Sequence, residues 1–539
     1  MASLVRDYGY PVSERTMAHI VADKAAKNGD KPFLHYLPDG RRFSYRDVHL
    51  ITNRLANGLA ARGIAKGDHV AVMMDNCPEQ FFAYLAIAKL GAVAVPLNTA
   101  ARGMLLTYFL THSDAVAFVA ERGYLARLSE IRADVPLLKL IVALDADSDA
   151  EMDDAEPFAA LLEASDDDIV TLVAVSDLAM LAYTSGTTGP SKGNMLAQGT
   201  TVYYGLTTAE SHGYRDDDVI YVCLPINHSN ALLCTLYGAM IADAQVALAR
   251  RFSASRYWDD IRSSGATLTN LLGSMINILW SREARDDDRD NQLRMCNCVP
   301  APPFGRGFEH RFGLRLTSGF GLTDYCLGTV YTILDPASKY GSAGRPRSGV
   351  SLVVADEHDV PLAPGEVGEI LLRTDNLYGA SAGYYKMPEA TVAASRNGWW
   401  HTGDRGYLDP DGYLYFADRK KDSIRRRGEN ISSFEVESVL LQHAAIADVA
   451  AYPLKSEMAE EEVAVSVMLA EGQQLTEVEL VEYAARNMAY YMVPRFVEFV
   501  EDFPRTQSQK VEKYKVRAAA EANRNLLWDR DKAGITFTR

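Results

Sequence analysis

The sequence has few of the features that define several common protein classes. Only six of its 539 residues are cysteine, and the closest two, Cys296 and Cys298, have no second Cys or His cluster at metal-binding spacing. We therefore expect neither a disulfide framework nor a zinc site, and the default compartment is a reducing cytoplasm. No repeat of about 20–50 residues is visible, which argues against a solenoid.

Long apolar runs are also missing. The longest one, residues 81–97, is interrupted by a lysine, a glycine and a proline, so no membrane span is expected. Residues 1–7 lack the basic-then-apolar pattern of a signal peptide.

The chain has fewer basic than acidic residues, and its net charge is −16. This excludes a nucleic-acid-binding surface of the usual basic kind but not a phosphate ligand, because local amides and single cations can hold phosphates. With 48% hydrophobic and 23% charged residues the chain is typical of globular proteins. Its length indicates two to four domains, in a monomer or homodimer.

The first half of the chain alternates strand-like and helix-like segments. Residues 69–74 form a β-rich run, residues 78–90 indicate an amphipathic helix, and residues 92–96 form a second buried strand. This order predicts parallel strands in an α/β sheet.

The pattern changes after residue 341. Segments 350–355 and 369–373 lie between Gly-, Pro- and Asp-rich turns, which predicts an antiparallel β module. A charged cluster at 418–422 follows, and the roughly 115 residues beyond it suffice for a small α+β domain. We expect an N-terminal domain at 1–418, a linking segment at 419–422 and a C-terminal domain at 423–539.

The strongest motif is YTSGTTGPSKG at residues 183–193, directly after an apolar run at 178–182. Its glycines permit sharp turns, and its hydroxyls and amides can donate to phosphate oxygens. Lys192 adds a mobile cation. The spacing differs from the common P-loop. The predicted phosphate ligands are Thr184, Ser185, Gly186, Thr187, Thr188, Gly189 and Lys192.

This motif resembles the signature of the adenylate-forming superfamily, which includes acyl-CoA ligases, peptide-synthetase adenylation domains and beetle luciferase. Further matching segments follow in the family's order, over residues 15–517. The resemblance implies a large N-terminal α/β domain with a β-barrel-like module, hinged to a small α+β C-terminal domain. It also implies that residues 1–418 bind ATP and the acyl substrate, that 419–422 are the hinge, and that 423–539 are mobile. It also implies ATP, Mg²⁺ and coenzyme A as cofactor and co-substrates, and a small carboxylic acid as the second substrate.

The nucleotide contacts implied by this resemblance come from four segments. In GFGLTD, Phe320 would stack on adenine, Thr323 would touch the α-phosphate, and Asp324, where the family has Glu, would hold Mg²⁺. Asp404 of the Thr-Gly-Asp motif and Arg419 would bind the ribose. The set is completed by Gly319, Gly321, Leu322, Ala301 and Pro302.

The mobile domain is implied to supply the chemistry of both half-reactions. In the segment RRRGENIS, Arg425, Gly428 and Glu429 would meet coenzyme A, and the arginine triplet 425–427 would face its phosphates. Lys510 would bridge the carboxylate and the α-phosphate during adenylation. Lys421 would be the hinge residue.

The resemblance also locates the acid. His228, with Thr184 and Lys510, completes the catalytic set, and the expected acyl pocket contains His228, Asn230, Gly273, Ser274 and Cys326. The shortened stretch 298–304 and the Gly-Glu-Asn of the mobile loop also resemble the carnitine and crotonobetaine CoA ligase branch. These features do not name the acid.

Several functions compete at this point. We expect an acyl-CoA ligase that forms an acyl-adenylate. The alternatives are an adenylating enzyme that loads a carrier-protein thiol, a non-catalytic nucleotide-binding relative and a luciferase-like oxidation. Retention of Lys192, Asp404, Arg419 and Lys510 together argues against the non-catalytic alternative.

Overall fold

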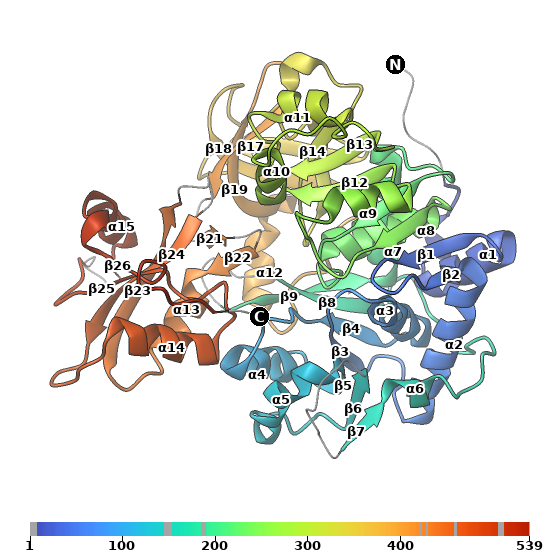
Figure 1. Cartoon of the computed structure of the whole chain (residues 1–539), viewed down its shortest axis with the longest axis horizontal. Helices are drawn as coiled ribbons and strands as arrows, with labels where there is room; N and C mark the ends of the chain where they lie inside the picture. The colour runs from blue at the N-terminus through green and yellow to red at the C-terminus, as the bar shows by residue number, and fades with distance from the viewer. Residues whose placement is uncertain are drawn as a thin grey trace.

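The computed structural model describes residues 8–144, 154–184, 190–419, 423–426, 429–456, 461–504 and 511–537. For residues 274, 418, 419, 423 and 430 it describes the backbone alone. A large α/β region comes first in the chain, and a smaller lobe follows it (Figure 1). None of the helices in the described ranges has the length and apolar character needed to span a bilayer.

One large sheet has seven strands in the order β7-β6-β5-β3-β4-β8-β9. All neighbours are parallel except β8 and β9, which are antiparallel. The strands are β3 (His69–Met73), β4 (Val93–Pro96), β5 (Ala115–Glu121), β6 (Leu140–Leu144), β7 (Ala155–Pro157), β8 (Leu178–Thr184) and β9 (Lys192–Ala197). The strands expected at residues 69–74 and 92–96 are therefore adjacent and parallel, as predicted.

The second large sheet has nine strands in the order β16-β15-β14-β13-β12-β10-β11-β1-β2. It is parallel from β14 to β1 and antiparallel at both edges. The strands are β1 (Pro32–Tyr36), β2 (Arg42–Ser44), β10 (Val219–Val222), β11 (Gln245–Leu248), β12 (Leu268–Leu272), β13 (Met295–Val299), β14 (Arg315–Leu322), β15 (Cys326–Tyr331) and β16 (Arg345–Pro346).

Helices fill the space between these sheets and cover their outer faces. The largest apolar core combines residues of both sheets with residues of α2 (Tyr45–Ala61), α3 (Pro78–Leu90), α7 (Gln198–His212), the π-helical η4 (Asn230–Tyr237) and α8 (Gly238–Ile241). The remaining helices of this region are α1 (Met17–Asn28), α4 (Gly103–His112), α5 (Leu125–Ser129), α6 (Phe158–Leu161), α9 (Tyr257–Ser264), α10 (Gly273–Trp280) and α11 (Gly305–Phe312).

Helix α3 has the predicted bounds but not the predicted amphipathic character. Every residue of α3 except Glu79 is buried, because the helix lies in the core shared by the two sheets. Its buried lysine is satisfied internally, because the Lys89 ammonium donates to Asn53 Oδ1 at 2.6 Å. Burial lowers the pKa of Lys89 to about 7.

The β module predicted after residue 341 is a four-stranded antiparallel sheet in the order β17-β18-β19-β20. Its strands are β17 (Val350–Ala355), β18 (Gly368–Thr374), β19 (Trp400–Leu408) and β20 (Leu414–Arg419), and α12 (Pro388–Ala394) packs on β19.

The C-terminal lobe has its own sheets and core. A hairpin of β21 (Ser423–Arg426) and β22 (Glu429–Ser432) precedes a four-stranded sheet. That sheet contains β23 (Ile446–Lys455), β24 (Glu461–Leu469), β25 (Phe496–Phe499) and β26 (Trp528–Asp529), with helices α13 (Ser433–Leu440), α14 (Glu477–Asn487) and α15 (Lys513–Ala522). Helix α14 lies against α4, and Ala100 packs into the lobe's core. The α/β class with a small α+β lobe is confirmed.

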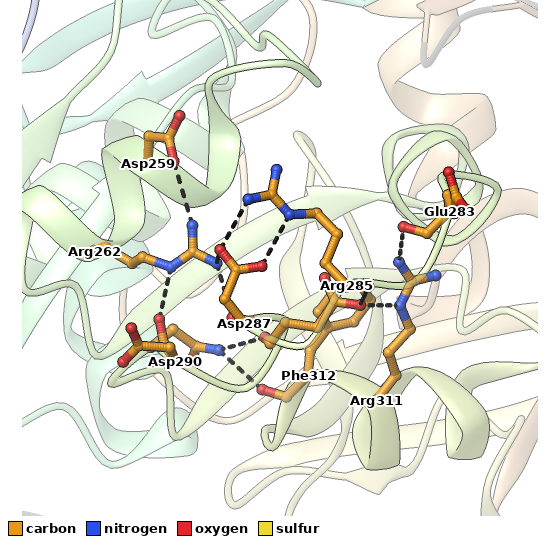
Figure 2. Close-up of polar contacts among 10 residues, drawn as sticks. Asp259, Arg262, Glu283, Arg285, Asp287, Asp290, Arg311 and Phe312 are labelled. Atoms are coloured by element: carbon orange, nitrogen blue, oxygen red, sulfur yellow. Dashed lines mark hydrogen bonds and ion pairs between the residues drawn. The ribbon is translucent and has the colours of Figure 1, made fainter.

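An arginine-rich network fixes the loop between α10 and β13 (Figure 2). Arg311 of α11 donates to the carbonyls of Trp280, Arg282 and Glu283 at 2.9–3.0 Å and pairs with Asp288 at 2.6 Å. Arg262 of α9 reaches the carbonyls of Asp287 and Asp290, each at 2.8 Å. These contacts hold the start of β13, whose other end reaches the candidate site.

Candidate active site

The candidate site is a cavity of about 480 Å³ where strand ends of both large sheets meet the β module and the C-terminal lobe. Ligands of open α/β sheets commonly bind at the carboxyl ends of parallel strands. The α/β region contributes residues of β8, β13, β14 and η4, and the β module contributes residues 400–404. The C-terminal lobe contributes Arg425, Glu429, Glu435, Tyr491 and Met492.

The predicted phosphate residues that the structure describes lie together at this cavity. Thr184 and Lys192 face each other across the β8–β9 pair, and both line the cavity. Asn194 Nδ2 donates to Thr184 Oγ1 at 3.2 Å. The Lys192 ammonium makes a cation–π contact with Tyr384, 4.6 Å from its ring centroid, and both residues line the cavity. Ser185 to Gly189 lie outside the described residues.

The predicted metal ligand, Asp324, lies beside this lysine. It lines the cavity, is 7% exposed, and its Oδ1 accepts a 2.5 Å hydrogen bond from the Tyr384 hydroxyl. Burial raises the pKa of Asp324, and the Tyr384 hydrogen bond opposes that rise. Among the described residues no group of three or more His, Cys, Asp or Glu side chains could hold a metal. A single carboxylate oxygen fits Mg²⁺ that takes most of its ligands from phosphates and water.

The two predicted ribose ligands come from paired strands. Asp404 of β19 and Arg419 of β20 are directly opposite in the antiparallel register. Asp404 lines the cavity and is 6% exposed, and its backbone N–H donates to Thr402 Oγ1 at 3.1 Å. The Arg419 side chain lies outside the described part of the chain.

The predicted adenine segment is only partly at the cavity. Gly319, Gly321, Leu322 and Thr323 line it. Phe320 is instead in the apolar core of the β module, where its ring lies 6.5 Å from that of Phe416.

The second predicted adenine segment also differs from the expectation. Of the described cavity residues, Asn297 and Val299 come from this stretch, whereas Ala301 and Pro302 do not line the cavity. The Pro302 carbonyl accepts a hydrogen bond from the Tyr340 hydroxyl at 2.7 Å, which directs it into the protein.

The mobile-loop residues that are described meet the N-terminal region here. Glu429 Oε1 lies 3.3 Å from His228 Nε2 and accepts from Asn98 Nδ2 at 3.1 Å. Arg425 lines the same cavity. The predicted residues Gly428, Lys421 and Lys510 lie outside the described residues.

The idea that all of Arg425 to Arg427 face coenzyme A does not hold for Arg426. Its side chain is 2% exposed, pairs with Glu462 at 2.6 Å and donates to the carbonyls of Tyr491 and Val493. Alternation along β21 places Arg426 and Arg425 on opposite faces, so a run of three arginines in sequence cannot form one cationic surface.

Glu435 is a contact that sequence reasoning missed. Its Oε1 accepts hydrogen bonds from the backbone N–H of Ser191, at 3.0 Å, and from the Ser191 hydroxyl. Burial raises the pKa of Glu435 to about 7, and the two bonds from Ser191 oppose the rise. A carboxylate of the C-terminal lobe therefore accepts donors at the end of the predicted phosphate loop. One glutamate in an ordinary helix start carries no sequence signal for such a role.

Only some of the predicted acyl-pocket residues line the cavity. His228, Asn230 and Cys326 line the cavity, together with Cys234 and Leu272, which were not predicted. Gly273 packs against Pro300, and a Cβ there would lie 3.3 Å from the proline ring. The Ser274 side chain lies outside the described residues.

A second cavity, of about 820 Å³, lies between α4 and α5 of the N-terminal region and α14 of the C-terminal lobe. Three of its lining residues are Arg102, Arg127 and Arg486. Burial and the nearby charge of Arg102 lower the pKa of Arg127, so two guanidinium groups repel each other here. Isolated arginines carry no motif, and the sequence therefore did not reveal this cluster.

Comparisons with known proteins agree with this geometry. Residues 21–385 match the AMP-binding enzyme family, and residues 435–510 match the AMP-binding enzyme C-terminal domain. The chain is 32% identical to a crotonobetaine/carnitine–CoA ligase of Salmonella agona (strain SL483) over 91% of this chain and 96% of that protein.

Two solved structures extend the comparison. An o-succinylbenzoate CoA synthetase double mutant from Bacillus subtilis, bound with a product analogue, gives a TM-score of 0.81 at 25% identity, covering 92% of this chain and 97% of that chain. ATP-bound MatB from Rhodopseudomonas palustris gives 0.69 at 26% identity, covering 94% and 99%. The chain belongs to the AMP-binding, adenylate-forming family of AMP-forming acid–thiol ligases.

Proposed function

We propose that this enzyme converts a carboxylic acid, ATP and coenzyme A into acyl-CoA, AMP and pyrophosphate through an acyl-adenylate. The observation that carries the proposal is the shared cavity. It is lined by Lys192, Asp324 and Asp404 from the α/β region and β module, and by Arg425 and Glu429 from the C-terminal lobe. One cavity can therefore serve both half-reactions.

In the first half-reaction, a carboxylate oxygen attacks the α-phosphorus of ATP and pyrophosphate leaves. Lys192 lines the cavity and would neutralise the polyphosphate, and the buried Asp404 carboxylate is suited to accept hydrogen bonds from ribose hydroxyls. Asp324 would hold Mg²⁺, which supplies charge neutralisation to the phosphates when bound. Lys510 keeps its proposed role as the cation that stabilises charge at the attacked phosphorus.

In the second half-reaction, the thiol of coenzyme A attacks the acyl-adenylate and AMP leaves. The arginine cavity supports coenzyme A as the acceptor, because its nucleotide end carries phosphates that need cations. Within the described residues, Arg102, Arg127 and Arg486 form no ion pair with a carboxylate, although Glu130 and Asp134 line the same cavity. Arg102 Nε is buried without a hydrogen-bond partner there. A phosphate would relieve the repulsion between Arg102 and Arg127.

The position of the C-terminal lobe supports the inference that the structure has the conformation used in the second half-reaction. Glu429 reaches the cavity, and Glu435 accepts the Ser191 donors that could otherwise meet a phosphate. The TM-score is 0.81 to the relative bound with a CoA product analogue and 0.69 to the ATP-bound one, at similar coverage. We infer that pyrophosphate leaves before Glu435 docks.

We further propose that the acyl group is modest in size and uncharged. Besides His228, the described acyl residues and their neighbours that line the cavity are Asn230, Cys234, Leu272, Asn297 and Cys326, which carry no charged side chain. The name of the similar ligase includes crotonobetaine, which carries a trimethylammonium group. None of these five residues is a carboxylate that could pair with that positive charge.

An acid panel with ATP, Mg²⁺ and coenzyme A tests the proposal. Short aliphatic, aryl and trimethylammonium acids are compared for release of AMP and pyrophosphate and for loss of free thiol. We expect one AMP and one pyrophosphate per coenzyme A consumed. Release of ADP and phosphate would contradict an adenylate mechanism. Turnover only with a carrier-protein thiol would exclude coenzyme A as the acceptor.

A further inference from the structure

A row of polar side chains crosses the nine-stranded sheet next to the acyl end of the cavity. Asn270 of β12, Asn297 of β13 and Thr317 of β14 are partners in the register of neighbouring parallel strands. They therefore lie on one face of the sheet, on strands about 4.8 Å apart. All three side chains are buried.

The row occupies positions where a buried parallel sheet normally has apolar residues. Two positions earlier on the same face, Leu268 and Met295 belong to the largest apolar core. On the opposite face, Leu271 and Cys296 belong to another apolar core. The polar row lies closer to the carboxyl ends of the strands, where Asn297 lines the cavity.

The hydrogen bonds of Asn270 fix the orientation of Asn230 at the start of η4. The Nδ2 of Asn270 donates to Thr235 Oγ1 at 2.6 Å and to Asn230 Oδ1 at 3.5 Å. The Thr235 hydroxyl gives its only hydrogen to the Asn230 carbonyl at 2.9 Å, so it must accept from Asn270. Because Asn270 then presents its amino group, Asn230 must turn its oxygen toward Asn270.

Two amide donors remain at the cavity after these bonds are made. Asn230 points its Nδ2 away from Asn270, and among the described residues no acceptor bonds to that nitrogen. Asn297 Oδ1 accepts from Thr317 Oγ1 at 3.5 Å, and Asn297 also interacts with the His212 imidazole. The Asn297 Nδ2 likewise has no hydrogen-bond acceptor in the described part of the chain. Both asparagines line the cavity.

We propose that the acid carries an uncharged oxygen acceptor, an oxo or hydroxyl group, and that the Nδ2 atoms of Asn230 and Asn297 bind it. The proposal rests on the proposed function, because it names the class of acid that this site activates. Amide N–H groups require an acceptor, which an oxygen supplies. The neighbouring Cys234, Leu272 and Cys326 supply no cation for a second carboxylate.

A plain alkyl chain fits these donors poorly. It would displace water from both amide groups and return no hydrogen bond, so the site should discriminate against it. A site that hydrogen-bonds a substrate group rejects the analogue without that group far better than an apolar pocket rejects a similar chain.

Acyl-sulfamoyl adenosines measure this preference without turnover, because they resemble the acyl-adenylate but do not transfer the acyl group. Three matched pairs are titrated into the whole chain by calorimetry: 3-hydroxybutanoyl against butanoyl, 4-oxopentanoyl against pentanoyl, and 5-oxohexanoyl against hexanoyl. In at least one pair we expect the oxygenated analogue to bind about tenfold tighter, the scale of one hydrogen bond. Equal binding within all three pairs overturns the proposal.

Substitutions assign the preference to the two asparagines. Asn230→Leu should bring the ratio of dissociation constants to about one, and Asn297→Leu should reduce it. Asn523→Leu makes the same change at an exposed position after α15 and should retain the ratio. Asn230→Asp keeps the oxygen that accepts from Asn270 but replaces the donor with an acceptor, so an oxo analogue should lose its advantage.

The ratio is taken within one protein, so a variant with a smaller folded fraction still reports it. ATP alone should bind both leucine variants as it binds the wild type. Weaker ATP binding by Asn297→Leu with the preference intact would assign Asn297 to the nucleotide and overturn its place in the proposal.

The outcomes separate this preference from the proposed function. Equal binding of the paired analogues overturns the preference and leaves the function intact. If none of the analogues binds, the adenylate site fails, and the preference fails with it. If the oxygenated analogues bind tighter but coenzyme A is not acylated, the acceptor is wrong and the preference stands. Tighter binding of a pentanedioyl analogue than of every oxo or hydroxy analogue would overturn the uncharged class.

Discussion

The loop between α10 and β13 and the junction between α4 and α14 both contain clustered arginines, but the two clusters differ in their partners. In the loop, Arg262 and Arg311 are engaged by backbone carbonyls and carboxylates of the same region (Figure 2). At the junction, Arg102 and Arg127 have carbonyl partners but, within the described residues, no carboxylate. An arginine whose donors and charge are paired within the protein stabilises the fold. An arginine without a carboxylate partner is suited to bind an anionic ligand.

Arg311→Met should cause the largest effect of these variants, a decrease in the free energy of unfolding. The change leaves Asp288, which has an 8% exposed side chain, without its cation, and such a loss costs about 3–5 kcal/mol. Urea unfolding followed by fluorescence measures it, since Arg311 lies 5.7 Å from the Trp280 ring. Arg285→Met is the control, because its side chain is 72% exposed and a solvent-screened ion pair contributes little to stability. Equal losses in both variants would contradict the comparison.

Lys510→Ala should cause the next largest effect, on chemistry rather than on stability. Loss of one donor to the transition state slows adenylation by about 10²–10³-fold. Thioester formation from supplied acyl-adenylate should change little, because the lobe has then turned a different loop to the cavity. Pyrophosphate exchange and single-turnover transfer to coenzyme A separate the two steps. A similar fall in both steps would contradict either the role of Lys510 or the rotation.

Arg102→Gln should raise the KM for coenzyme A by about tenfold, the scale of one charge-assisted hydrogen bond. Pyrophosphate exchange should be unaffected, because the cavity of Arg102 is separate from that of Lys192. Added salt should weaken the wild-type enzyme more than the variant. Dephospho-coenzyme A sharpens the test: if Arg102 meets the 3′-phosphate, the variant and the wild type should use this analogue equally well.

What the sequence predicted well is local. The β3–α3–β4 unit and the strands of the β module follow from short patterns. The ordered motifs predicted Lys192, Asp324 and Asp404, which line one cavity, and their roles stay predictions. The amphipathic character of α3 was wrong because periodicity does not reveal that a second sheet covers the other face. Phe320 differs from expectation because a strand alternates its side chains between two faces, and a motif does not say which face meets the ligand. Ala301 and Pro302 lie beyond the end of β13, where the motif does not reveal the course of the chain.

The remaining site residues could not be predicted because they are assembled by tertiary contacts. Cys234 and Leu272 come from separate segments that meet at the cavity, and Arg102 and Arg486 come from different lobes. Each is a single residue in an ordinary segment. Their significance depends on neighbours that only the fold supplies.

Glu435→Gln should have the smallest effect, and its sign depends on pH. Because burial raises the pKa of Glu435 to about 7 in the docked arrangement, docking takes up a proton between the ordinary carboxyl range and about pH 7. Docking is therefore favoured at low pH and weakens as the pH rises through this window. Glutamine keeps the oxygen that accepts from Ser191 but never ionises, so the variant should remain docked at about pH 8.

The Glu435→Gln variant should change the rates of the two half-reactions in opposite directions. Near pH 4.5, the ordinary pKa of a glutamate, the enzymes should differ least, because the wild type increasingly carries the proton in both arrangements. Near pH 8 the variant should transfer the acyl group of supplied acyl-adenylate to coenzyme A about fivefold faster than the wild type. It should perform adenylation correspondingly more slowly, because the two conformations are modestly coupled to the protonation of Glu435. Ser191→Ala is the matched control, since it removes the hydroxyl donor from the same carboxyl and should weaken docking at both pH values. A variant whose two half-reactions changed in the same direction would show that Glu435 acts on the site directly and not through the position of the lobe.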